Sequence, residues 1–155
     1  MRRLMLALAL AAAPLPALAQ EVLAEYRASS GSLPPEYAWS VTATIAADGG
    51  VVLTHCKGHE TEGPACTTRR GTATPARVQA IRDAVAASGL IGNPARESDG
   101  IMVGGGSVRG RVRIDGSEIV LPAQPAPEDA TRVAAVLSAI RAAIPDRLAA
   151  GFPQD

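Results

Sequence analysis

Both histidines and both cysteines of the chain lie within twelve consecutive positions, as His55, Cys56, His59 and Cys66. Imidazole nitrogens and thiolate sulfurs bind zinc, a cysteine pair can undergo redox chemistry, and two exported cysteines close in sequence form a structural disulfide. No other stretch brings together as many groups of these kinds. The chemistry of this stretch therefore depends first on the compartment, because the compartment sets the redox state of the cysteines.

Residues 1–19 have the three parts of a secretory signal peptide. Arg2 and Arg3 form a basic start, residues 4–13 are an apolar run, and Ala17-Leu18-Ala19 forms a small-x-small cleavage site before Gln20. The run is shorter than the ~20 residues of a membrane span, and no cysteine at the cleavage site accepts a lipid. We expect residues 20–155 to form one small mature domain, periplasmic or secreted, without a stable membrane anchor.

Export favours a disulfide between Cys56 and Cys66. The nine residues between them include Gly58, Gly63 and Pro64, which form a flexible loop that can bring the two Cα atoms within bridging distance. Cys-x-x-Cys spacing, which is typical of redox proteins, is absent. The sequence therefore predicts a structural staple here.

Metal binding by His55 and His59, with Cys56 and Glu60 nearby, is the alternative interpretation of the same stretch. A His-x-x-x-His pair faces one way on a helix, but β-branched residues before His55 and Gly58 after it indicate a strand end and a loop. In a strand the two imidazoles are about 13 Å apart, too far for one ion without a bend. We expect no tight metal site.

The charge balance argues against polyanionic partners. Removal of Arg2 and Arg3 with the leader leaves 13 basic and 15 acidic residues, a net charge of −2 with histidine neutral. Nucleic acids and anionic membranes both require a concentrated basic patch. The nearest candidate is the alternating set Arg109, Arg111 and Arg113, which indicates one solvated face of a strand.

The pattern of apolar residues predicts an α+β domain. Strands are expected at residues 22–28, 39–45, 51–56, 108–114 and 118–121, and a weaker candidate spans 65–70. Thr74 and Pro75 start a helix that stops at Gly89, and Pro127-Glu128-Asp129 opens a second helix that ends at Pro145. The expected order is β-β-β-α-β-β-α, with both helices packed on one face of an antiparallel sheet.

Three segments together resemble emfourin-like domains. They are "TPARVQAIRDAVAASGLIGNPA" from Thr74, "VRGRVRIDGSEIVL" from Val108, and "APEDATRVAAVLSAIRAAI" ending at Ile144. The resemblance rests on the order helix, small-residue stop, hairpin and closing helix over residues 74–144. It implies a protease-inhibitor-like module, because the known representative inhibits thermolysin-type metalloproteases, but it carries over no site residue.

The remaining motifs do not indicate catalysis. Residues 104–107, Gly-Gly-Gly-Ser, lack the lysine and the following helix of a phosphate-binding loop, so no cofactor is expected. The sequence contains no Gly-x-Ser-x-Gly elbow, and a catalytic triad would have to use a histidine beside the cysteine pair.

We therefore expect an exported, non-enzymatic domain that binds another exported protein. A small metal-handling protein is the alternative, and a hydrolase is the third possibility. The candidate partner-binding loop is Ile101, Met102 and Val103, because three consecutive apolar residues between glycines fit neither strand nor helix periodicity.

Overall fold

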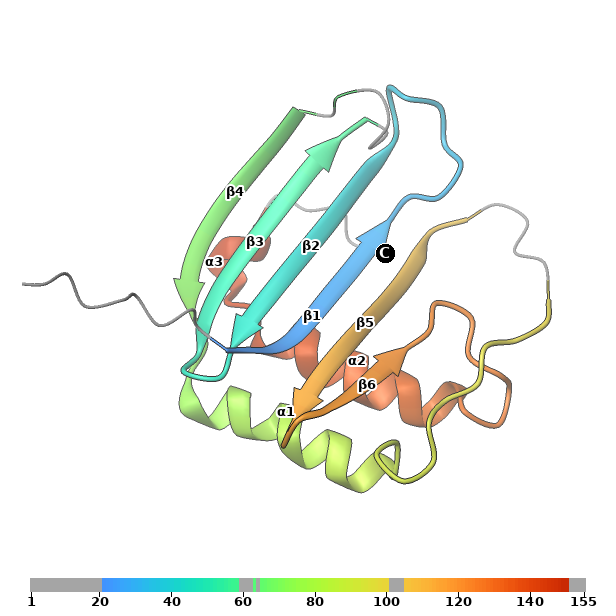
Figure 1. Cartoon of the computed structure of the whole chain (residues 1–155). Helices are drawn as coiled ribbons and strands as arrows, with labels where there is room; N and C mark the ends of the chain where they lie inside the picture. The colour runs from blue at the N-terminus through green and yellow to red at the C-terminus, as the bar shows by residue number, and fades with distance from the viewer. Residues whose placement is uncertain (1–20, 59–62, 64, 101–104, 151–155) are drawn as a thin grey trace, which may run out of the picture.

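The computed structural model describes residues 21–58, 63, 65–100 and 105–150. Within these residues the chain forms an antiparallel sheet of six strands, and two long helices cover one of its faces (Figure 1). The predicted α+β class and the packing of both helices on one face are thereby confirmed. The elements are β1 (Val22–Ser29), β2 (Trp39–Ala46), β3 (Gly50–Lys57), β4 (Ala65–Thr72), α1 (Pro75–Ser88), β5 (Ser107–Ile114), β6 (Ser117–Leu121), α2 (Ala130–Ala143) and α3 (Asp146–Ala149).

The strands are arranged in the order β4-β3-β2-β1-β5-β6, and every neighbouring pair is antiparallel. Both predicted hairpins close on the expected turns. Gly49 has a φ of 94°, and Asp115 and Gly116 have φ values of 50° and 77° between β5 and β6. Positive φ at both central residues matches the right-handed twist of the flanking strands. The first strand lies at the centre of the sheet, between β2 and β5.

The two long helices begin and end at the signals that the sequence provides. The Thr74 side chain accepts a hydrogen bond from the Arg77 amide, Pro75 is the first helical residue, and Gly89 adopts a φ of 69° after the last turn of α1. Gly89 lacks a Cβ, so it enters this left-handed conformation without a steric penalty. Asp129 precedes α2, and Ile144 follows it in an extended conformation before Pro145.

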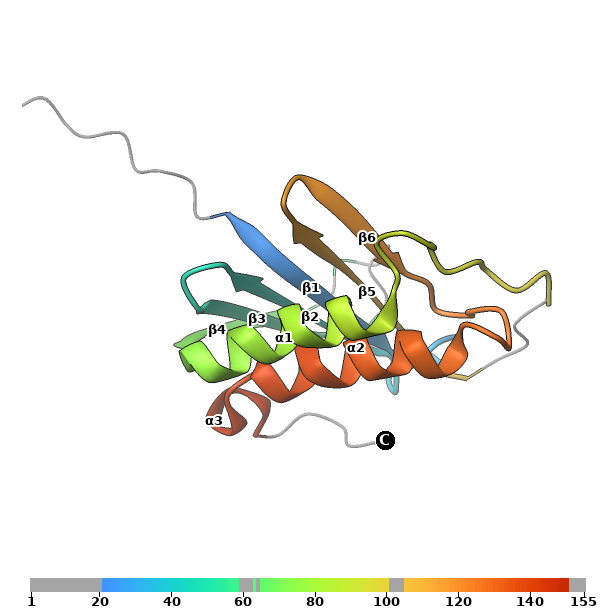
Figure 2. The same cartoon turned by 90° about the horizontal axis from the view of Figure 1, so that it is seen from below.

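The hydrophobic core lies between the helix layer and the covered face of the sheet (Figure 2). Alternate residues of β1, β2, β3 and β5 point toward the helices, which contribute one apolar stripe each. The fully buried large side chains are all aliphatic: Leu23, Ile45, Leu53, Ile81, Leu90, Leu121, Ile140, Val51, Val85, Val112, Val133 and Val136. The scarcity of aromatic residues is therefore compensated by close packing of branched aliphatic side chains.

The structure contains one strand more before α1 than the predicted order. The weak candidate at 65–70 forms β4, which extends over Ala65–Thr72 at the edge of the sheet. None of its residues is buried, so the alternation of apolar and polar residues that reveals other strands is absent. The short helix α3 was also not predicted, and it packs Leu148 against Gly71 of β4, where a Cβ would approach within 2.9 Å.

A buried carboxylate attaches the long loop after α1 to the second helix. Asp129, 4% exposed, accepts a 2.7 Å hydrogen bond from the Arg96 amide and bonds of 3.0 and 2.7 Å from the Arg132 guanidinium. These donors, the Arg96 amide first and Arg132 second, lower the pKa of Asp129 from its ordinary value. The interactions of Asp129 with Arg96 and Arg132 therefore have a structural role, since they hold the loop after α1 against α2.

The predicted signal peptide lies outside the described residues. Among the described residues, no helix has the length and apolar character needed to cross a membrane.

Candidate binding surface on the open face of the sheet

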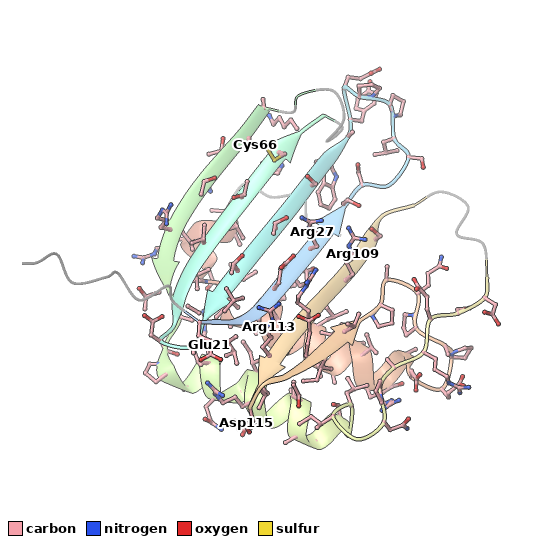
Figure 3. The ribbon with its side chains drawn as sticks, viewed as in Figure 1. Glu21, Arg27, Cys66, Arg109, Arg113 and Asp115 are labelled. Carbon is pink, nitrogen blue, oxygen red and sulfur yellow. A yellow bond between two sulfur atoms is a disulfide. The ribbon has the colours of Figure 1, made fainter. Side chains whose placement is uncertain are left out.

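Cys56 and Cys66 form the predicted disulfide. They are direct cross-strand partners in β3 and β4, with a Cα–Cα distance of 4.0 Å. Cys56 lies next to the alternate positions Val52 and Thr54, which face away from the helices, so the bridge lies on the uncovered face of the sheet (Figure 3). The bond is a staple between the edge strand β4 and β3, the one described strand that pairs with it.

His55 lies on the opposite face from the disulfide, because consecutive residues of a strand alternate. Burial lowers the pKa of its imidazole below the ordinary 6.5, and the positive charges of Lys57 and Arg69 lower it further. Cys56, bonded to Cys66, has no thiolate to offer a metal. His59 lies outside the described residues, within which no group of three or more His, Cys, Asp or Glu side chains is placed to hold a metal ion.

The predicted loop residues Ile101, Met102 and Val103 also lie outside the described residues. The end of the glycine-rich segment is described, and it is packed closely. A Cβ on Gly106 would lie 2.9 Å from the Ser29 carbonyl oxygen, and one on Gly31 would lie 1.7 Å from the Gly105 carbonyl oxygen. Glycine at these positions thus has a structural role, in that it lets the entry to β5 approach the end of β1.

The open face is the side of the sheet turned away from α1 and α2, and no described helix covers it (Figure 2). Its side chains are mostly hydroxyl and guanidinium groups. Ser29 and Ser107 share a 3.0 Å hydrogen bond, and Thr54 and Thr68 share one of 3.1 Å. The register sets these side chains in cross-strand rows: Cys66, Cys56, Ser40, Ser29 and Ser107; then Thr68, Thr54, Thr42, Arg27 and Arg109; then Arg70, Val52, Thr44, Glu25, Arg111 and Val120.

Four arginines gather on the β1 and β5 part of this face, and we call them the arginine cluster: Arg27, Arg109, Arg111 and Arg113. Arg27 and Arg109 are direct cross-strand partners, and their side chains lie on the same side of the sheet (Figure 3). Like charges placed directly opposite each other destabilise a sheet, typically by a few tenths of a kcal/mol. The repulsion between Arg27 and Arg109 therefore opposes folding, so the stability of the sheet does not explain why both positions carry arginine.

Two glutamates neutralise part of the arginine cluster. Glu25 lies 3.8 Å from Arg27 and 3.6 Å from Arg111, measured between carboxylate oxygen and guanidinium nitrogen. Glu118 lies 4.0 Å from Arg111 and 2.8 Å from Arg113. Arg109 has no ion pair with any residue that the structure describes. With Arg70 of β4 included, five guanidinium groups lie on the open face with Glu25 and Glu118, and Glu97 adds a third carboxylate at the corner where β6 ends, so guanidinium groups outnumber carboxylates there while the whole chain is neutral.

A cavity of about 320 Å³ adjoins the arginine cluster where β6 ends. Arg109 and Arg111 line it together with Glu97, which comes from the loop after α1, and Pro122, which follows β6. The pairing of β6 stops at Gly110, so β5 extends beyond its neighbour at this corner. The cavity is a recess in the flat face, and its charged lining consists of the guanidinium groups of Arg109 and Arg111 and the carboxylates of Glu25, Glu97 and Glu118.

The sequence predicted the β5 part of the arginine cluster but not the part that β1 contributes. Arg109, Arg111 and Arg113 alternate along β5 and lie on a solvated sheet face, as predicted. Arg27 was not connected with them, because the pairing of β1 with β5 joins segments about 80 positions apart and leaves no local pattern. No protein-family model matches the chain, and no curated protein matches it either.

Proposed function

We propose that this chain is an exported, non-enzymatic domain that binds another exported protein through the open face of its sheet. The observation that carries the proposal is that Arg109, which has no ion pair with any described residue, lies opposite Arg27 on a face where guanidinium groups outnumber carboxylates. Arginine is enriched at protein interfaces, because its planar group binds carboxylates with two hydrogen bonds at once. A partner surface bearing carboxylates would relieve the repulsion within the pair.

The composition of the open face favours binding over catalysis. Four of its hydroxyl groups are hydrogen-bonded in two pairs, Ser29 with Ser107 and Thr54 with Thr68, and Glu25 and Glu118 are paired with arginines. A general acid or base needs a titratable group aimed at a substrate. A rigid sheet with a polar surface instead supplies a preorganised platform, which lowers the entropic penalty of association.

The resemblance of residues 74–144 to emfourin-like domains makes a thermolysin-type metalloprotease the first partner to assay. The measurement is thermolysin activity on a chromogenic peptide, at increasing concentrations of the oxidised mature protein. Saturable inhibition supports the inhibitor form of the proposal, and its absence removes that form. The wider proposal is then tested on proteins captured from the exported fraction and identified by mass spectrometry.

The decisive variant is the double charge reversal Arg27→Glu with Arg109→Glu. We expect it to weaken binding of the identified partner at least tenfold, or about 1.4 kcal/mol, because both changes place carboxylates against the acidic partner surface. Binding of the wild type is expected to weaken as salt is raised, since exposed charges are screened within about 10 Å at 0.1 M.

The matched control is Arg77→Glu with Arg82→Glu, which changes the net charge equally but on α1, in the helix layer. This variant should bind the partner within about twofold of wild type, a difference of less than 0.5 kcal/mol. Equal loss in both variants would show a general charge effect. Equal retention in both would remove the open face as the binding surface.

A further inference from the structure

The edge strand β4 is bound to the sheet on one side only. Its eight residues pair with β3 from Ala65↔Lys57 to Thr72↔Gly50 without a register shift, and no other strand of the described residues lies beyond it (Figure 1). The opposite edge is shorter, because β6 has five residues. β4 is therefore the longer and more regular of the two sheet edges.

The disulfide shows which backbone groups of β4 point outward. Antiparallel partners alternate between hydrogen-bonded pairs, about 5.5 Å apart at Cα, and non-hydrogen-bonded pairs, about 4.5 Å apart. Cys56 and Cys66, at 4.0 Å, belong to the second kind. The amide and carbonyl of Cys66 therefore point away from β3, and by alternation so do those of Thr68, Arg70 and Thr72.

Four donors and four acceptors thus line the outer edge of β4. No described residue forms a backbone hydrogen bond with them, since β3 is the only described strand that pairs with β4. Natural edge strands are usually shielded by proline, lysine, a bulge or a covering loop. Within Ala65–Thr72 there is no proline, no lysine and no bulge, and the charged side chains of this edge are those of Arg69 and Arg70.

The charges next to this edge are basic. Arg69 and Arg70 are adjacent in β4, which has no acidic residue, and Lys57 lies at the end of β3. The Arg69 guanidinium donates to the carbonyls of Leu148 and Ala150 on the helix side, at 3.2 and 2.8 Å. The Arg70 side chain is exposed on the open face, in the strand at the edge of the sheet.

We propose that β4 is a strand-addition site, which binds an extended acidic segment of a partner protein as a seventh strand. Main-chain hydrogen bonds along Cys66, Thr68, Arg70 and Thr72 would supply the affinity, as in other cases of β-augmentation, and Arg70 would select a carboxylate at the facing position. A second copy of this chain fits less well, because antiparallel β4–β4 pairing gathers four arginines along one seam without an acid.

The probe is a blocked peptide of alternating threonine and valine with two central glutamates. It is compared with the same peptide carrying lysine in place of glutamate, and with the glutamate peptide N-methylated at every second amide. The measurement is amide hydrogen exchange of the oxidised, ¹⁵N-labelled protein, followed residue by residue. We expect the glutamate peptide to slow exchange at Cys66, Thr68, Arg70 and Thr72 at least tenfold, which corresponds to about 1.4 kcal/mol.

The inward amides provide the internal control. Those of Thr67 and Arg69 are bonded to β3 in the free protein, so they should change much less than their neighbours. The lysine peptide should bind at least tenfold more weakly, about 1.4 kcal/mol, and the N-methylated peptide should not protect any amide. Thr68→Pro removes an outward donor and should abolish protection, while Thr68→Val keeps the donor, loses only the hydroxyl, and should behave as wild type.

Three outcomes would overturn the proposal. Uniform exchange with and without the glutamate peptide would show that the edge does not accept a strand. Equal binding of the N-methylated peptide would show that side chains alone make the contact. Protection that appears with rising protein concentration in the absence of peptide would assign the edge to a second copy. The open-face variant Arg27→Glu with Arg109→Glu should leave peptide binding unchanged, so failure of one proposal does not imply failure of the other.

Discussion

Replacement of both cysteines by serine tests how much of the stability depends on the β3–β4 staple. The bridge joins residues ten positions apart. Removing a cross-link that closes a loop of this size increases the conformational entropy of the unfolded chain, which lowers the free energy of unfolding by about 2.5 kcal/mol at 25 °C. Cys66 is exposed and Cys56 half-buried, so the smaller serine leaves no core cavity. We therefore expect the full loss to come from the unfolded state, and the melting temperature to fall by about 10 °C.

The assay is urea unfolding of three samples: the oxidised wild type, the reduced wild type and the double variant Cys56→Ser with Cys66→Ser. The reduced protein and the variant should agree, and both should lie about 2.5 kcal/mol below the oxidised protein. Labelling of the denatured, unreduced wild type should find neither Cys56 nor Cys66 free. A loss below about 0.5 kcal/mol, within the range of ordinary surface substitutions, would refute the reasoning.

Three further outcomes follow from particular contacts. Thr74→Ala removes the oxygen that accepts the Arg77 amide at the start of α1, and urea unfolding should show a loss of about 1 kcal/mol. Gly110→Ala places a Cβ 2.7 Å from the Glu25 carbonyl oxygen and 3.1 Å from Leu137, so the melting temperature should fall. The control Gly92→Ala should leave the melting temperature nearly unchanged, because a Cβ there meets no atom within 4 Å. Burial, Lys57 and Arg69 hold the pKa of His55 below 6.5, so between that pKa and 6.5 the unfolded chain binds a proton that the folded chain does not. The free energy of unfolding should therefore fall as the pH drops through 6.5 toward the pKa of the folded state. The variant His55→Gln should flatten this pH dependence.

The sequence predicted those elements whose signals are local. Thr74, Pro75 and Gly89 mark both ends of α1, and the Asp115-Gly116 turn defines the β5–β6 hairpin. Each signal works through one or two residues in direct contact, so no knowledge of the rest of the fold is needed. The disulfide was predictable for the same reason, since the expected signal peptide and the short spacing of the two cysteines are both local sequence features.

The open-face cluster was not predictable as a cluster, because it depends on strand order. Arg27 meets Arg109 only when β1 occupies the centre of the sheet, and neither residue carries information about that position. The strand β4 was only a weak candidate for a different reason. Thr67, Thr68, Arg69 and Arg70 form no apolar face, and the pairing that makes them a strand involves the backbone, which every sequence shares.

The absence of buried residues in β4 also bears on what the strand is for. A strand that contributes no buried side chain adds little to the hydrophobic stabilisation of the domain, while ordering its eight residues has an entropic penalty for each of them. The Cys56–Cys66 bridge and the contact of Leu148 with Gly71 offset part of that penalty at either end of the strand. No side chain of β4 belongs to the core cluster, so the strand addition proposed above would give this strand a role that hydrophobic burial does not supply.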